Sequence, residues 1–158
     1  MSPSIPSGCE GLIPHLVCCP CAEAMEFYKQ AFGAEEIARH PAPDGKRLMH
    51  AQMLIGGQMV YLADDFPEYC DGKAQNPKGL GGTPVTIHRY VEDCDAAIIR
   101  AAHAGATVKM PAADMFWGDR YGVVTDPFGH NWSFATHQRD LSPEELSAAA
   151  AAAFAGHP

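Results

Sequence analysis

The stretch AEAMEFYKQAFGA, residues 22–34, decides the fold of this chain. Met25, Tyr28 and Phe32 recur at the spacing of one helical face. Gly33 follows as a helix C-cap, because glycine adopts the left-handed conformation at little steric cost. A short apolar, partly β-branched segment at residues 12–18 precedes this helix, and a second strand is expected at residues 35–40. The stretch therefore predicts a strand, a helix and a strand in succession.

The same order returns in the second half of the chain. Its helix is DAAIIRAAHAGA, residues 95–106, which again ends in Gly-Ala and runs into a strand that is expected to stop before Pro111. The remaining strands are predicted at residues 47–54, 58–63, 84–91, 119–125 and 131–137, with a hairpin at Gly56-Gly57. A strand, a helix and three strands that occur twice predict an α+β fold of two tandem βαβββ modules.

The predicted boundaries divide the chain into four parts. Residues 1–11 are expected to form a flexible N-terminus. Residues 12–70 form the first module and residues 83–137 the second, and the two together make one compact domain. Residues 138–158 form a tail, whose helix is expected to begin at the N-cap Ser142, followed by Pro143 and two acidic residues.

The composition of the chain argues against several classes of protein. The 158 residues are 47% hydrophobic and 19% charged, which is ordinary for a globular protein. The net charge of −8 argues against a nucleic-acid partner, because neutralising phosphates requires a surplus of lysine and arginine. No apolar run has the roughly 20 residues of a membrane span, and the first eight residues lack the pattern of a signal peptide. We therefore expect a cytoplasmic protein with neither a nucleic-acid nor a membrane partner.

Two motifs of the second half carry a family resemblance. FWGDRYG at residues 116–122 and DPFGH at residues 126–130, with Phe27-Tyr28 and Phe32-Gly33-Ala34, resemble the vicinal-oxygen-chelate superfamily. That superfamily includes glyoxalase I, bleomycin- and fosfomycin-resistance proteins and extradiol dioxygenases, and the best match is its PhnB-like branch. The resemblance covers roughly residues 12–145 and implies curved sheets that form a cup around a small molecule, in a homodimer. Because members include both enzymes and pure binders, the site residues have to decide the function.

Metal-using members of that superfamily take their ligands from the first and last strands of each module. Carried over by register, those positions fall near Ile13, Gln52, Thr86 and Ser133, so a His/Glu metal site is not expected there. However, His15, His50 and His88 each lie two residues from such a position, and strand alternation places them on the same face. These imidazoles could together bind a divalent ion such as Zn, Fe, Ni or Mn, or could be hydrogen-bonded residues of the cavity. The remaining histidines are expected in loops or on helix surfaces: His40, His103, His130, His137 and His157.

Aromatic residues of the second module are the candidate wall of the cavity, because ligand cavities are mostly apolar with a few placed polar groups. Arg120 could pair with an anionic ligand, or could bond Asp119, Asp126 or a loop carbonyl. The full set of candidate ligand-binding residues is His15, His50, Gln52, His88, Phe116, Trp117, Arg120 and Tyr121.

The six cysteines are expected to be free thiols, because a cytosolic domain of this size needs no disulfide framework. Cys18 and Cys21 form a C-x-x-C motif, and a thiol near a helix N-terminus can have a lowered pKa. Three functions therefore stay open. The first is a small-molecule binder without a standard metal site, the second a metal-dependent lyase, isomerase or dioxygenase, and the third a redox thiol protein.

Overall fold

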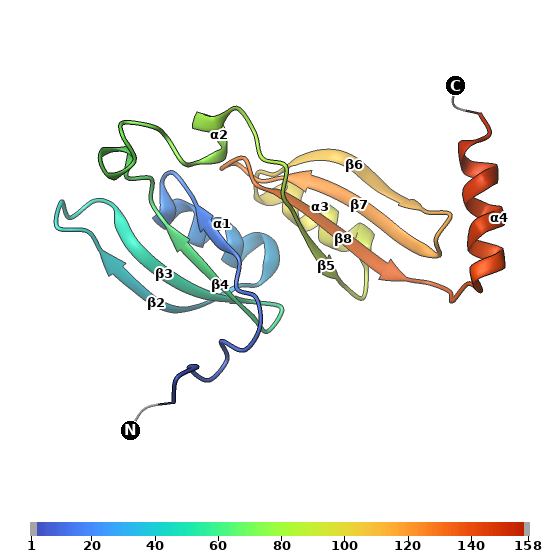
Figure 1. Cartoon of the computed structure of the whole chain (residues 1–158), viewed down its shortest axis with the longest axis horizontal. Helices are drawn as coiled ribbons and strands as arrows, with labels where there is room; N and C mark the ends of the chain where they lie inside the picture. Colours follow the sequence, from blue (N-terminus) through green and yellow to red (C-terminus); the bar gives the residue numbers. More distant parts are fainter. Residues whose placement is uncertain (1–2, 157–158) are drawn as a thin grey trace.

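The structure, a computed structural model, describes residues 3–156. Residues 1–2 of the predicted N-terminal segment and His157 lie outside this range. Two four-stranded sheets lie side by side along the long axis of the molecule, and the last helix stands at its far end (Figure 1). Among the described residues, no helix has the length and apolarity needed to cross a membrane.

The first sheet, sheet A, has the strand order β1-β4-β3-β2. The short β1 (His15–Val17) runs parallel to β4 (Gln58–Ala63), which is followed by the antiparallel β3 (Leu48–Ile55) and β2 (Glu35–Pro41). Helix α1 (Cys21–Phe32) ends at Gly33 with φ +67°, as its sequence predicts. The first strand is shorter than the predicted residues 12–18, because Leu12 is fully exposed and pairing begins only after Pro14.

The second sheet, sheet B, repeats this topology in the order β5-β8-β7-β6. Its strands are β5 (Thr86–Tyr90), β6 (Thr107–Asp114), β7 (Asp119–Thr125) and β8 (Asn131–His137), and α3 (Cys94–Ala104) crosses one face. The prediction that Pro111 ends its strand is wrong. Since β6 is the edge strand and its register shifts between Met110 and Ala113, the missing N–H of Pro111 costs no ladder hydrogen bond.

Two segments lie outside the modules. The connection between the sheets holds a short 3-10 turn η1 (Pro67–Tyr69) and a single helical turn α2 (Pro77–Leu80). The tail helix α4 (Pro143–Phe154) begins with a capping box in which Ser142 and Glu145 satisfy each other's backbone N–H groups. No residue of α4 is buried, and its Phe154 touches the body at Phe116, with ring centroids 5.9 Å apart.

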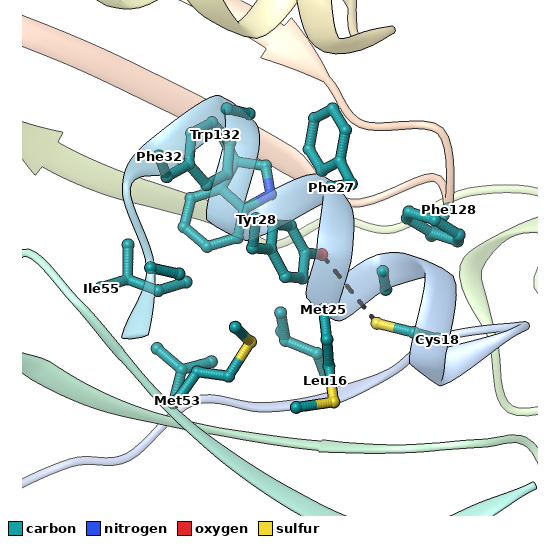
Figure 2. Packing of buried hydrophobic residues seen from close by; sticks show 14 of the residues in the cluster. Leu16, Cys18, Met25, Phe27, Tyr28, Phe32, Met53, Ile55, Phe128 and Trp132 are labelled. Carbon is teal, nitrogen blue, oxygen red and sulfur yellow. Dashed lines mark hydrogen bonds between the residues drawn. The ribbon is translucent and has the colours of Figure 1, made fainter. Parts of the chain in front are cut away.

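One core serves both modules. Helix α1 lies against sheet A, but the ring of its residue Phe32 also packs on Trp132 of sheet B at a centroid distance of 4.6 Å (Figure 2). The same ring packs on Phe134 of sheet B at 5.4 Å. The buried carboxylate of Asp126 accepts a hydrogen bond of 2.6 Å from the hydroxyl of Tyr28 on α1 and one of 3.0 Å from Trp132 Nε1. The modules are therefore joined through their helix-bearing faces.

Among residues 3–156, no second layer of helices or strands packs on the opposite face of each sheet, which we call its open face. The N-terminal segment touches the open face of sheet A at Tyr61, whose hydroxyl lies 3.5 Å from Cys9 Sγ. Because side chains alternate along a strand, His50 and Gln52 lie on the open face of sheet A while Ala51 and Met53 point into the core. On strand β8 of sheet B, Trp132 and Phe134 point into the core. The residues that alternate with them, Ser133 and Ala135, point to the open face. Apart from Asp119, Ser133 and Ala135, the open-face residues of the strands of sheet B are half-buried or exposed.

Candidate functional site

The open face of sheet A carries a group of imidazoles. His15 and His50 approach with ring centroids 6.0 Å apart, and Tyr61 packs edge-on against His50 at 4.7 Å. Gln52 Nε2 lies 3.2 Å from His50 Nε2. His40, which the sequence placed on the surface, stacks beside His50 at 6.2 Å because it is the strand partner of that residue. Partial burial, together with its neighbours His15 and His40, lowers the pKa of His50.

The open face of sheet B is organised around Asp119, which is only 5% exposed. Its Oδ2 accepts hydrogen bonds from the hydroxyl of Tyr90 at 2.9 Å and from Trp117 Nε1 at 3.2 Å. Its Oδ1 lies 2.8 Å from Nδ1 of His137. Burial by itself raises the pKa of Asp119, but the hydrogen bonds from His137, Tyr90 and Trp117 outweigh it and lower the pKa. An ionised carboxylate thus holds three side chains of this face in place.

His88 lies beside this group. Its Nδ1 is 2.8 Å from the hydroxyl of Ser133, and among residues 3–156 its Nε2 has no hydrogen-bond partner. The ring packs edge-on against Tyr90, at 4.9 Å, and stacks near Tyr121, at 6.0 Å. Trp117 packs edge-on against Tyr121 at 5.6 Å. Three predicted residues, His88, Trp117 and Tyr121, therefore come together on one face.

The sequence of the chain matches a known protein family. The profile of the Glyoxalase/Bleomycin resistance protein/Dioxygenase superfamily matches residues 13–134, which is more than half of the chain. This chain belongs to that superfamily. An uncharacterized protein of Mycobacterium tuberculosis is 53% identical over 138 residues, which is 87% of this chain and 81% of the relative.

Solved structures of the superfamily fold agree. TioX of Micromonospora sp. ML1 superimposes with a TM-score of 0.60 at 28% identity, over 80% of this chain and 99% of that one. The PhnB protein of Bacillus cereus gives a TM-score of 0.59 at 18% identity, over 80% and 99% of the two chains, and shows the shared fold alone. The resemblance to the superfamily that the sequence motifs carry is thereby confirmed.

The three histidines predicted as metal ligands do not come together within a single chain. His15 and His50 lie together on sheet A, whereas His88 lies on sheet B. Within the described part of the chain, no three metal-binding side chains lie close enough to share an ion. Within residues 3–156, the side chains of a single chain therefore do not supply a set of three ligands for a divalent metal ion.

Arg120 does not lie with the aromatic residues of the open face, where the sequence analysis expected it to contact a ligand. Its guanidinium pairs with Asp95 of α3 and, at 3.0 Å, with Asp114 of β6. It bonds neither Asp119 nor Asp126, because alternation along β7 turns it toward α3 while Asp119 and Tyr121 point to the open face. Because Arg120 already pairs with two carboxylates, it holds helix α3 against sheet B.

Sequence reasoning missed three members of the site on sheet B, namely Asp119, Tyr90 and His137. Tyr90 lies two residues after His88 on the same strand, so alternation alone would have placed it on the same face. His137 is exposed, as expected, but its ring also bridges Asp119 and Asp140, with a distance of 3.0 Å to the latter. His130, also expected on the surface, lies with Nε2 2.9 Å from the carbonyl oxygen of Val17 in the other module. Local sequence carries no signal for such long-range partners.

The predicted thiol chemistry is not supported by the cysteine environments. Cys18 and Cys21 are both fully buried, and burial raises the pKa of Cys18 well above its usual value. Burial, with the charge of Asp64, raises the pKa of Cys21 to about 12. The Asp64 carboxylate accepts the backbone N–H of Cys21 at 2.9 Å, so a negative charge already occupies the helix N-terminus. The expectation of a lowered pKa at Cys21 is therefore wrong.

We predict that Cys18 and Cys21 are inert in the folded protein. The thiolate is the reactive species, and both burial and raised pKa suppress it. In a time course of maleimide labelling followed by peptide mass spectrometry, the exposed Cys19 should be modified first. Cys18 and Cys21 should react only after denaturant is added. Native-state labelling of Cys21 as fast as that of Cys19 would reinstate the redox hypothesis.

The pKa of His137 is predicted to lie above the usual histidine value of 6.5, because Asp119 and then Asp140 stabilise its protonated form. A raised pKa means that this interaction contributes its full stability below pH 6.5 and loses it as the pH rises through the pKa of folded His137. An NMR titration of the imidazole proton should show the high pKa. Asp119→Asn should lower that pKa more than Asp140→Asn, and equal values in all three proteins would contradict the assignment.

Proposed function

We propose that this protein binds a planar, largely apolar small molecule on the open face of sheet B, against Tyr90, Trp117 and Tyr121. The observation that carries the proposal is the anchoring of two of these rings by buried Asp119. Tyr90 is 59% exposed and Trp117 37% exposed, so their apolar surface lies open to solvent although their polar atoms are fixed. Aromatic side chains held in this way form a preorganised stacking surface, because their ordering entropy is lost before a ligand arrives.

His88 is the proposed polar anchor of the ligand. Its bond to Ser133 fixes the ring, and Nε2, which has no hydrogen-bond partner among residues 3–156, can donate to or accept from a ligand according to the tautomer. A few fixed polar groups within an apolar wall are what orients a small molecule in a binding site. Phe116, which the sequence predicted as a ligand-binding residue, is proposed to support this wall indirectly. Its ring packs against that of Trp117, with the centroids 5.1 Å apart.

The cup is proposed to close by homodimerisation. Because the helix-bearing faces are used up in the shared core, neither open face can cover the other within one chain. Leu12 and Val85 next to β1 and β5 are also exposed, at 100% and 62%, which suits burial against a second copy. The open face of sheet A, with His15, His50 and Gln52, would then form the opposite wall. Light scattering after size exclusion should give the mass of two chains.

Ligand-induced stabilisation tests the binding proposal. A panel of aromatic compounds should contain one that raises the melting temperature by several degrees, because a ligand that binds only the folded state stabilises it. Trp117→Ala and Tyr121→Ala should each abolish that increase. Tyr69→Ala is the matched control, since Tyr69 is 84% exposed in η1 of the other module and should leave the increase intact. An unchanged increase in all three variants would rule out this face.

A metal-dependent enzyme remains a second candidate, and one observation favours it. A histidine whose other ring nitrogen is fixed by a hydrogen bond, as in His88 with Ser133, is typical of metal ligands. Elemental analysis of protein purified without an affinity tag distinguishes the candidates. We expect far less than one equivalent of Zn, Fe, Ni or Mn. A stoichiometric metal that is lost in the double variant His15→Ala, His88→Ala would favour the enzyme.

A further inference from the structure

We propose that a groove between α2 and the adjoining end of sheet B binds a small oxyanion, the phosphate or carboxylate group of a small molecule. The groove has a volume of about 480 Å³. It is separate from the aromatic residues described above, and the inference does not depend on the proposed function. The side chains and backbone that line it come from α2, the loop after it, β6, and the β7–β8 turn: Pro77, Lys78, Gly81, Gly82, Thr83, Lys109, Thr125, Gly129 and Asn131.

Charge is the first argument for an anion. Lys78 and Lys109 are the only ionisable residues of the lining, and no carboxylate faces them there. Within residues 3–156 neither lysine takes part in an ion pair. The lining has two cations and no acid, although the chain as a whole has a net charge of −8. Two uncompensated ammonium groups attract an oxyanion.

The neutral side chains of the groove supply hydrogen-bond donors. Thr125 Oγ1 donates to Asn131 Oδ1 at 2.8 Å, so the acceptor end of the Asn131 amide is occupied. In the part of the chain that the structure describes, the amide nitrogen of Asn131 has one long contact, 3.4 Å to the carbonyl oxygen of Thr83, and keeps a free N–H. Thr125 and Asn131 also belong to a row of polar side chains that crosses all four strands, with Thr86 and Thr107 as their strand partners. The N–H donor of Asn131 therefore lies within a row of polar side chains at one end of the sheet.

The segment that carries Lys78 is held rigidly. The buried Asp65 accepts the backbone N–H groups of Gln75 and Asn76 at 2.9 and 3.0 Å, and the Asn76 side chain caps α2 by accepting from Gly79 N. Gly129 of the β7–β8 turn has φ +94° and lies close to α2. A Cβ atom on residue 129 would lie only 2.9 Å from Pro77 Cβ, so the lack of a side chain at Gly129 allows this close approach. A site that is fixed before binding does not spend binding energy on ordering its backbone.

The test uses the full-length protein and inorganic phosphate at low ionic strength, with backbone amide NMR shifts as the readout. Saturable shifts are expected at Gly81, Gly82 and Asn131. The double variant Lys78→Gln, Lys109→Gln should bind phosphate more weakly by about tenfold or more, because it loses two charge-assisted contacts. Lys46→Gln is the matched control, an exposed lysine in the β2–β3 turn whose side chain makes no hydrogen bond among the described residues.

A parallel titration with acetate separates the two sources of the oxyanion. Saturable shifts with both anions indicate a general oxyanion site, and shifts with phosphate alone indicate a phosphate group. The proposal is overturned if neither anion gives saturable shifts at these residues, or if Lys46→Gln weakens binding as much as the double variant. Amide spectra of the variants without anion show whether each is folded, because substitution of an exposed lysine should leave them nearly unchanged.

Discussion

Asp126→Ala is expected to lower the free energy of unfolding by about 3 kcal/mol or more. Asp126 is 4% exposed and accepts four hydrogen bonds, from the side chains of Tyr28 and Trp132 and from the backbone N–H groups of Phe128 and His130. Alanine would leave these donors without their acceptor in a water-poor environment, and each buried donor so stranded costs about 1–3 kcal/mol. Because Tyr28 belongs to the first module, the loss also weakens the joint between modules.

Urea denaturation provides the measurement, with Tyr28→Phe as a graded comparison. Tyr28→Phe removes one of the four donors and should cost about 1 kcal/mol. The double variant should cost less than the sum of the single variants, because the two residues share one bond. Asp140→Ala, at a fully exposed aspartate, is the matched control and should cost less than about 1 kcal/mol. Strict additivity of the first two would show that the Tyr28–Asp126 bond contributes nothing.

Phe32→Ala is expected to cost about 3–5 kcal/mol, the usual range for removing a buried phenyl ring. Phe32 is 6% exposed and packs against four other rings, including Trp132 and Phe134 of sheet B. The cavity left behind would open at the contact between the modules, where two rigid sheets cannot both move inward to fill it. This variant therefore reports on how tightly the modules are coupled.

Phe154→Ala is the control for Phe32→Ala. It makes the same change at a ring that is 66% exposed on α4 and should alter stability by less than about 0.5 kcal/mol. The shared core further implies that the wild-type protein unfolds in a single transition, followed equally by circular dichroism and by tryptophan fluorescence. Two separate transitions, or equal losses in both phenylalanine variants, would mean that each module has a core of its own.

Most secondary-structure elements follow from local pattern. Residues 58–63, 119–125 and 131–137 are strands with the predicted bounds, and both module helices end at the predicted glycines, Gly33 and Gly105. Local pattern succeeds there because alternation and helix capping are decided within a few residues. It failed at Pro111, since whether a proline is tolerated in a strand depends on that strand being at the edge of its sheet.

In the candidate site, too, local pattern placed some residues correctly and others wrongly. Strand alternation alone was enough to expect His15 and His50 on one face, and the structure brings them together. It was not enough to place His88, because alternation fixes a face of one sheet and says nothing of how two sheets are oriented to each other. Cys21 shows the reverse error, where a local rule on helix N-termini was overridden by burial and by Asp64, which lies 43 residues further along the chain.

The sequence by itself determined the repeated βαβββ order, the ends of the helices and membership in the superfamily, because each of these is written in short-range periodicity or motif. The tertiary structure alone decided that the two modules share a core through their helix-bearing faces, joined by Asp126 and Phe32. It also decided that Asp119 collects Tyr90, Trp117 and His137, and that Arg120 turns away from them. Those outcomes depend on contacts between residues far apart in the chain, whose geometry is set by packing and burial and not by local spacing.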